Sequence, residues 1–368
     1  NVVGEWSVGS EIEMTRVIDF KSVGKSDIPE VGGKCASLGE LLDAGIRVPH
    51  GFAVTTRCYK EFISETGIEE DIFLTLNEIN PDDIAELDRR SETIRGLIKK
   101  NPMPIKIQKE VEEAYEGLGK AYHDLKLPVA VRSSATAEDL PTASFAGQQD
   151  TYLWTIGVAQ VIANIRRCWA SLYTSRAISY RIKNNFKHQD VFISVGIQKM
   201  VSSKTSGVMF TIDPTNGDPS KVVIEGSWGF GETVVGGYVN PDKFVVDKIT
   251  KEINQRKISQ KHIECVYDQD KGCIVHKDVD EDMQEERCLN DDEIKELVSI
   301  ARTIERHYGC PQDIEWTIDK EASFPDNIFI VQSRPETVWS QKQGKPLLGG
   351  KSGYDIMMER GLKTIKMT

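Results

Sequence analysis

Residues 313–319 read DIEWTID and residues 328–335 read IFIVQSRP. Polar and apolar side chains alternate in the first stretch, which is typical of a strand with one buried face. Positions 313, 315 and 317 share the polar face, and positions 314, 316 and 318 share the apolar one. A hairpin in which residue 319 pairs with residue 328 places Glu315 opposite Gln332. The same hairpin places Asp313 opposite Arg334.

This predicted pairing brings a carboxylate and an amide oxygen side by side, with an arginine one step along. Mg²⁺ prefers oxygen ligands and shares them with substrate phosphates, so Glu315 and Gln332 are candidate metal ligands. The alternative is structural. Asp313 and Arg334 would then form a cross-strand salt bridge on a solvated strand face, and the pairing alone fits both interpretations.

A second informative stretch, residues 131–148, reads VRSSATAEDLPTASFAGQ. A predicted strand at 128–133 ends near Arg132 and enters a loop of small and hydroxylated residues. Small side chains leave backbone N–H groups open to a polyphosphate, and the guanidinium fork of Arg132 matches phosphate oxygens. A flexible surface loop with a structural arginine is the alternative, but the unusual composition favours a functional loop.

Two shorter segments could also contact a nucleotide. Residues 31–34, VGGK, precede a helix predicted over 35–44, where free N–H groups and Lys34 could hold an anion. The G-x-x-x-x-G-K-[ST] pattern is absent, and a plain turn before a surface lysine is simpler for this segment alone. Residues 198–201, QKMV, end a predicted strand where backbone groups could bond an adenine beside Met200. Alone, they also fit an ordinary edge strand.

The rest of the chain alternates helices and strands. Residues 56–125 are charged and helical in character and are interpreted as a helical insert. Helices are predicted over about 158–172 and 291–308 from their apolar periodicity. Strand-like runs at 191–201, 207–212, 221–227 and 243–246 suggest one antiparallel sheet.

Composition excludes several classes of protein. The formal net charge of −11, from 46 Lys and Arg against 57 Asp and Glu, argues against a broad nucleic-acid footprint. No apolar run is long enough to span a bilayer, and residues 1–10 do not look like a secretory signal. The seven cysteines form no C-x-x-C pair, so reduced thiols and a cytoplasmic location are expected. The six histidines show no metal-ligand spacing.

Five motifs in one order carry a family resemblance: GGKCASLGELLDAGIRVPHGFAVTT (32–56), VRSSATAEDLPTASFAGQ (131–148), GVMFTIDP (207–214), EGSWGFGETVVGG (225–237) and QDIEWTID…IFIVQSRP (312–335). Together they resemble the nucleotide-binding domain of the phosphoenolpyruvate synthase and pyruvate phosphate dikinase family. That group includes rifampicin phosphotransferase and the ATP-binding subunit of phenylphosphate synthase. The resemblance covers about residues 17–339.

The resemblance implies an α+β ATP-grasp fold with ATP in the cleft between two subdomains. The expected boundaries are 15–190 for the first subdomain, with the insert at 56–125, 191–340 for the second, and 341–368 for a tail that could dock a partner or be a disordered end. Phosphate contacts and catalytic roles fall on Lys34, Arg132 and Arg334, and Mg²⁺ ligation on Glu315 and Gln332. The remaining implied nucleotide contacts are Thr136, Ser144, Phe145, Ala146, Gly147, Gln198, Met200, Val201 and Asp313.

The family's phosphorylated histidine usually sits in a Thr-x-His setting, and none of the six histidines has one. The chain is therefore expected to be part of a longer enzyme or one subunit of a split enzyme, acting on a histidine in trans. The predicted reaction converts ATP, an acceptor and water into AMP, phosphate and a phosphorylated acceptor. A phenylphosphate synthase-like subunit is the preferred interpretation. The alternatives are the N-terminal domain of a phosphoenolpyruvate synthase or rifampicin phosphotransferase, an ATP-grasp ligase, and a nucleotide-sensing subunit without turnover.

Overall fold

The computed structural model describes residues 15–136, 139–140, 143–144, 150–337 and 339. The segment expected to dock a partner, 341–368, lies outside them, as do Phe145, Ala146 and Gly147 of the predicted phosphate loop. Within the described part of the chain, no helix combines the length and the apolar character that crossing a bilayer requires.

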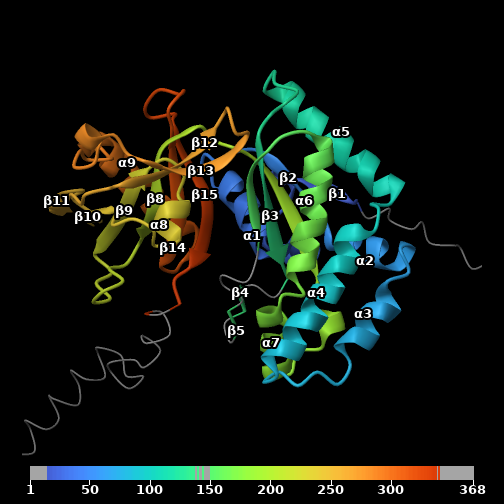
Figure 1. The fold of residues 1–368 in the computed structure, drawn as a ribbon. Coiled ribbons are helices and arrows are strands. Elements are labelled where there is room, and N and C mark those ends of the chain that lie inside the picture. Colours follow the sequence, from blue (N-terminus) through green and yellow to red (C-terminus); the bar gives the residue numbers. More distant parts are fainter. Residues whose placement is uncertain (1–14, 137–138, 141–142, 145–149, 338, 340–368) are drawn as a thin grey trace, which may run out of the picture.

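The first sheet has five antiparallel strands in the order β1-β2-β7-β3-β6. Their bounds are β1 (Val17–Asp19), β2 (Gly51–Val54), β3 (Val129–Ala135), β6 (Thr151–Thr155) and β7 (Ile193–Lys199). Figure 1 shows this sheet in the middle of the molecule, with most of the helices on one side. A short hairpin, β4 (Asp139–Leu140) with β5 (Ala143–Ser144), follows β3.

A layer of helices packs on one face of this sheet. It contains α2 (Thr56–Glu65), α3 (Glu69–Leu76), α4 (Ile84–Lys100), α5 (Ile105–Ala121), α6 (Val158–Ser171) and α7 (Ser175–Lys183). Trp169 of α6 is fully buried in this core and contacts the ring of Phe62 at 5.0 Å between centroids. Because α2 to α5 lie between β2 and β3 in the chain, the stretch predicted as a helical insert is helical here.

The other face of the first sheet packs on α1 (Ile28–Asp43), which also contacts β15 (Ile328–Pro335) of the second sheet. The helix is interrupted at Gly32, where φ is 71°. A Cβ at this position would lie 2.2 Å from the carbonyl oxygen of Ser134. Ser134 in turn donates from Oγ to Val31 O at 2.9 Å. The glycine is therefore required so that the start of α1 can touch β3.

The second sheet has six antiparallel strands in the order β11-β10-β9-β8-β14-β15. Their bounds are β8 (Ser203–Phe210), β9 (Lys221–Trp228), β10 (Asp242–Asp247), β11 (Ile253–Lys257), β14 (Gln312–Asp319) and β15 (Ile328–Pro335). Helix α9 (Asp291–Tyr308) packs its apolar stripe against this sheet. Its first turn is closed by a capping box between Asn290 and Glu293, and Gly309 ends it in a left-handed conformation.

Smaller elements complete the described chain. Helix α8 (Glu232–Val235) follows β9, and β12 (Ile263–Asp268) and β13 (Cys273–Asp278) form a separate hairpin. The short 3-10 helices are η1 (Phe20–Ser22), η2 (Lys25–Asp27), η3 (His188–Asp190) and η4 (Glu281–Met283).

One strand lies in a different sheet from the one predicted. The run at 191–201 was expected to pair with the strands that follow it, but β7 lies between β2 and β3 in the first sheet. Almost all of its side chains are buried, which suits a central strand covered on both faces. The first sheet therefore extends to Lys199, beyond the predicted boundary at residue 190.

The predicted hairpin forms, with one difference in register. Glu315 pairs with Gln332 and Asp313 with Arg334, as predicted. Nearer the turn, Ile318 and not residue 319 pairs with Ile328, because the register shifts after Glu315. The extra residue, Val331, forms a bulge that restores the predicted pairing toward the open end.

A candidate nucleotide-binding cleft

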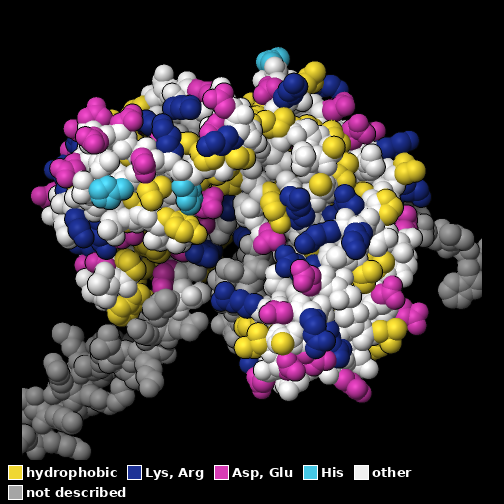
Figure 2. Space-filling view, viewed as in Figure 1, with side chains coloured by type: hydrophobic (Ala, Val, Ile, Leu, Met, Phe, Trp, Pro, Cys, Tyr) yellow, Lys and Arg dark blue, Asp and Glu magenta, His cyan; other side chains and the backbone are white. Residues whose placement is uncertain are grey.

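A cleft of about 400 Å³ lies between the two sheets. Figure 2 shows the furrow between the two halves of the molecule. Its lining comes from α1, β3, β6 and β7 on one side and from β8, α8, β14 and β15 on the other. Of the predicted site residues, the cleft brings together Lys34, Arg132, Gln198, Met200, Val201, Glu315, Gln332 and Arg334.

Arg132 lines this cleft and reaches from β3 to β15. Its Nη1 donates to Val331 O at 2.7 Å and to Gln198 Oε1 at 3.3 Å. Its Nη2 donates to Gln332 Oε1 at 2.6 Å. The Val331 carbonyl belongs to the bulge of β15, so the irregular register places an acceptor for the arginine. Its Nε is buried and has no partner among the described residues.

Glu315 and Gln332 face the same point of the cleft from neighbouring strands. Glu315 Oε2 lies 3.4 Å from Arg132 Nη2, the group that also bonds Gln332 Oε1. One carboxylate and one amide oxygen therefore converge on a single cationic group. This donor set fits Mg²⁺, which takes oxygen ligands and leaves further positions to water and phosphate.

Arg334 and Asp313 form the ion pair that the structural alternative describes. Arg334 Nη2 lies 2.8 Å from Asp313 Oδ2, and Nε donates to the same oxygen at 2.9 Å. Burial raises the pKa of Asp313, and Arg334 offsets that effect only in part. The Arg334 side chain is nevertheless 41% exposed and lines the cleft. The ion pair thus orients a guanidinium that remains accessible to a ligand.

Lys34 and Gln198 are fixed by contacts with the first sheet. Lys34 Nζ donates to Ser133 O at 3.2 Å, which holds the ammonium beside β3. Gln198 is buried, and its Nε2 donates to Pro49 O at 3.4 Å, so its carbonyl is turned toward Arg132. The Met200 amide donates to Pro128 O at 2.9 Å. A nucleotide base would therefore contact other groups of residues 198–201.

No described residue of the predicted phosphate loop, 136–147, lines the cleft. Thr136 Oγ1 lies against Phe192, donating to its carbonyl at 3.3 Å, and Thr136 does not line the cleft. Ser144 is described only as a backbone position of β5, paired with Asp139. Of the residues expected to cover the phosphates, Phe145, Ala146 and Gly147 lie outside the described residues, and Thr136 lies away from the cleft.

Several cleft residues had no place among the predicted contacts. Leu153, Ser206, Phe230 and Glu232 line the cleft. Phe230 and Glu232 belong to the glycine-rich motif at 225–237, and that motif was the available signal. The chain turns at Gly229, where φ is 72°. Glycine is needed at this position because a Cβ would lie 2.3 Å from Cys265 O.

Comparison with known proteins agrees with this cleft. Residues 28–351 match the family model described as "Pyruvate phosphate dikinase, AMP/ATP-binding domain". The chain belongs to this family. The family predicted from the five motifs is therefore confirmed, and the cleft lies within the matched residues.

Two similar proteins are named as phosphoenolpyruvate synthases. The chain is 47% identical over 350 residues to the "Probable phosphoenolpyruvate synthase" of Staphylothermus marinus, covering 89% of this chain and 42% of the relative. It is 43% identical over 356 residues to the "Phosphoenolpyruvate synthase" of Aeropyrum pernix, covering 90% and 43%. The chain thus spans less than half the length of these relatives.

Among solved structures, the ADP complex of N5-carboxyaminoimidazole ribonucleotide synthetase aligns with 70% of this chain and 58% of that one. Its TM-score is 0.22 at 9% identity, and this likeness carries no argument about the fold.

Proposed function

We propose that this chain is the nucleotide-binding part of a phosphoenolpyruvate synthase-type dikinase. It binds Mg-ATP between its two sheets, in an ATP-grasp arrangement, and passes a phosphoryl group to a histidine on a partner domain or subunit. The names of the relatives favour this alternative over the phenylphosphate synthase subunit that the sequence first suggested.

The observation that carries the proposal is the position of Arg132. Its guanidinium is held by uncharged acceptors and one long carboxylate contact, and its Nε is buried without a partner among the described residues. The guanidinium lines the cleft, where phosphate oxygens would accept from it in place of neutral acceptors. Lys34 and Arg334 line the same cleft. Cationic side chains gathered around one space are suited to a polyphosphate.

The chemistry follows from what these side chains can stabilise. A nitrogen of the acceptor histidine attacks the β-phosphorus, and the bond to the oxygen shared with the α-phosphate breaks, so AMP leaves. The β,γ unit on the histidine then loses phosphate to water. Catalysis of such a transfer depends on positioning and on neutralising charge over the phosphoryl oxygens. Arg132 and Lys34 would hold the phosphates, and Arg334 would stabilise the group in transfer.

Glu315 and Gln332 are the residues that would hold Mg²⁺, which neutralises phosphate charge when bound. For both to serve as ligands, Arg132 must share or give up its contacts with them. A phosphate that accepts from Arg132 would provide that exchange. Met200 and Val201, at the same cleft, would pack against the base.

The test is the identity of the product. The protein is incubated with Mg-ATP labelled in the β-phosphate, with and without a separately produced histidine-bearing domain. We expect binding of Mg-ATP by calorimetry, little turnover alone, and AMP plus acid-labile label on the added domain. An ATP-grasp ligase would produce ADP, and a nucleotide sensor would bind ATP without product in either arm. Either result would overturn the proposal.

A further inference from the structure

Three side chains able to ligate a transition metal meet at the rim of the cleft. Glu232 begins α8, Cys265 lies on β12 and His276 on β13. Their ligand atoms all lie within 4.8 Å of one another. Cys265 is buried, whereas Glu232 and His276 are exposed. Neither the family match nor the proposed phosphoryl transfer gives this trio a role.

The backbone holds these three positions together. Cys265 and His276 are directly opposite each other in the β12–β13 hairpin, so their side chains share one face of it. The Phe230 amide donates to Cys265 O at 2.8 Å, which binds the turn before α8 to β12. Glu232 follows two residues later. Two independent elements therefore fix the spacing of the donors.

We propose that Glu232, Cys265 and His276 bind a Zn²⁺-class ion, with the fourth position open to water. In a tetrahedral zinc site with a metal–sulfur distance of about 2.3 Å and a metal–oxygen distance of about 2.0–2.2 Å, sulfur and oxygen lie roughly 3.5 Å apart. The separation between Cys265 Sγ and Glu232 Oε2 is 3.7 Å. His276 is exposed, and its ligand atom lies within 4.8 Å of those of Cys265 and Glu232.

The chemistry of the donors selects the kind of metal. Thiolate and imidazole are softer ligands than the oxygen pair of Glu315 and Gln332, and they favour zinc over magnesium. The Cys265 thiol now donates to the Glu232 carboxylate. On binding a divalent cation, a coordinating thiol is deprotonated and its proton leaves to solvent.

A metal at this position would stiffen one wall of the cleft. It would link the β12–β13 hairpin to α8, and Glu232 lines the cleft directly. The same hairpin contacts the first sheet through Tyr267, whose ring stacks on Trp154 at 4.8 Å and 20°. Trp154 also meets Phe230 at 5.5 Å. The site would thus fix the place where the two halves touch across the cleft.

Cobalt titration tests the site directly. The chelator-treated protein is titrated with Co²⁺, which reports thiolate ligation by a near-ultraviolet charge-transfer band. We expect saturation at about one equivalent and loss of the band when Zn²⁺ is added. Cys265→Ser should abolish the band. Loss of an outer-sphere partner alone weakens metal binding by about 10–100-fold, so His276→Gln should weaken it by at least tenfold.

A matched control lies on the same hairpin. Cys273 is an exposed thiol on β13 outside the trio, and Cys273→Ser should leave the band and the affinity unchanged. Melting curves without metal identify any variant that fails to fold, and His276→Gln is a surface change that keeps the test open if Cys265→Ser is unstable. The proposal is overturned if the wild type gives no thiolate band, or if Cys273→Ser removes it. It is also overturned if folded His276→Gln binds Co²⁺ like the wild type.

Discussion

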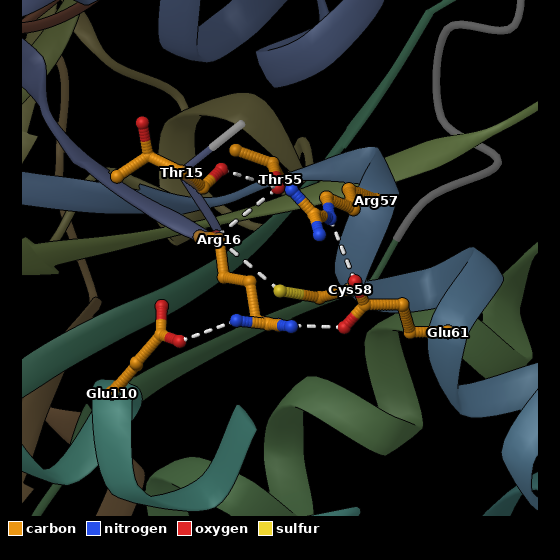
Figure 3. Close-up of polar contacts among 7 residues, drawn as sticks. All are labelled: Thr15, Arg16, Thr55, Arg57, Cys58, Glu61 and Glu110. Carbon is orange, nitrogen blue, oxygen red and sulfur yellow. Dashed lines mark hydrogen bonds and ion pairs between the residues drawn. The ribbon is translucent and has the colours of Figure 1, made fainter. Parts of the chain in front are cut away.

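Two arginines at the first sheet, Arg16 and Arg132, lie in opposite electrostatic settings. Arg16, just before β1, is surrounded by partners (Figure 3). Its Nε lies 2.6 Å from Glu61 Oε2 and its Nη1 lies 2.7 Å from Glu110 Oε1. Glu61 also accepts from Arg57 at 2.6 Å. The hydrogen bonds that Arg16 donates to these two carboxylates raise its pKa above the usual range.

Arg132, in the cleft, is held differently. Its short contacts are to the uncharged oxygens of Gln332 and Val331, and its carboxylate contact with Glu315 is 3.4 Å long. The positive charge of Arg16 is neutralised by two close carboxylates. The positive charge of Arg132 has one distant carboxylate partner among the described residues and is therefore able to attract an anionic ligand. We call Arg16, Arg57, Glu61 and Glu110 the closed cluster and Arg132, Glu315 and Gln332 the open cluster. A closed cluster serves stability, whereas an open cluster at a cleft is typical of a functional site.

The largest expected effect comes from breaking the open cluster. Arg132→Ala should slow phosphoryl transfer by roughly 10³-fold, because it removes a preorganised charge from the reacting phosphates. Single-turnover transfer from labelled ATP to a histidine-bearing domain measures this. Arg16→Ala is the matched control and should lower the melting temperature while leaving the transfer rate within about twofold. Equal losses of transfer in the two variants would contradict the distinction between the clusters.

The second prediction concerns the carboxylate of the open cluster. Glu315→Ala should reduce Mg²⁺-dependent transfer by roughly 10²-fold or more, since one of two protein ligands is lost. Transfer rates across a Mg²⁺ titration measure it, with circular dichroism to confirm folding. Glu225→Ala is the control, because Glu225 lies on the same sheet and pairs with Lys243 at 3.2 Å. Near wild-type transfer in Glu315→Ala would remove this residue from the metal site.

Arg334 lies between the two extremes, being paired and yet accessible. If it only forms the ion pair with Asp313, its loss costs about 1 kcal/mol or less. If it stabilises the phosphoryl group, Arg334→Ala should slow transfer by roughly 10²-fold, with a smaller loss of ATP affinity. Arg334→Lys should rescue only in part, since one ammonium cannot copy a two-pronged contact. Normal single-turnover transfer in Arg334→Ala, with an altered melting curve, would leave only the structural role.

The open cluster was partly predictable from the sequence. Period-two alternation placed Glu315 opposite Gln332 and Asp313 opposite Arg334, and the structure has both pairs. The bulge at Val331 was not predictable, because an inserted residue leaves the alternation on either side unchanged. That bulge supplies the carbonyl that Arg132 bonds. The contact between β3 and β15 spans 199 positions, and no local pattern encodes it.

Two other features of the fold could not be predicted from the sequence for related reasons. β7 follows the helical half in sequence but pairs with strands 58 or more residues earlier, such as Ala130 with Gln198. Its neighbours in sequence therefore indicated the wrong sheet. The β12–β13 hairpin has mostly exposed or half-buried side chains, so it shows no clear apolar face. Cys265 and His276 looked unrelated for this reason, although the hairpin places them opposite each other.

The smallest expected effect is the response of the closed cluster to acid. Burial raises the pKa of Glu61, but hydrogen bonds from Arg16 and Arg57 together hold it below its usual range. Because the folded state binds this proton more weakly than the unfolded state, the stabilisation is complete above the unfolded pKa of about 4.3. It is lost as the pH falls through the lower folded value.

Glu61→Gln removes this linkage and should cost about 1–3 kcal/mol of unfolding free energy at pH 7. The difference from wild type should narrow steadily below about pH 4, as the wild-type carboxyl takes up its proton. Urea unfolding at pH 7, 5, 4 and 3 measures it. Glu116→Gln, which breaks an exposed pair with Lys120 at 3.5 Å, should change stability by less than about 0.5 kcal/mol throughout. A Glu61→Gln difference that stayed constant down to pH 3 would mean that the cluster stabilises the fold by shape and packing, and not by the charge that sets it apart from Arg132.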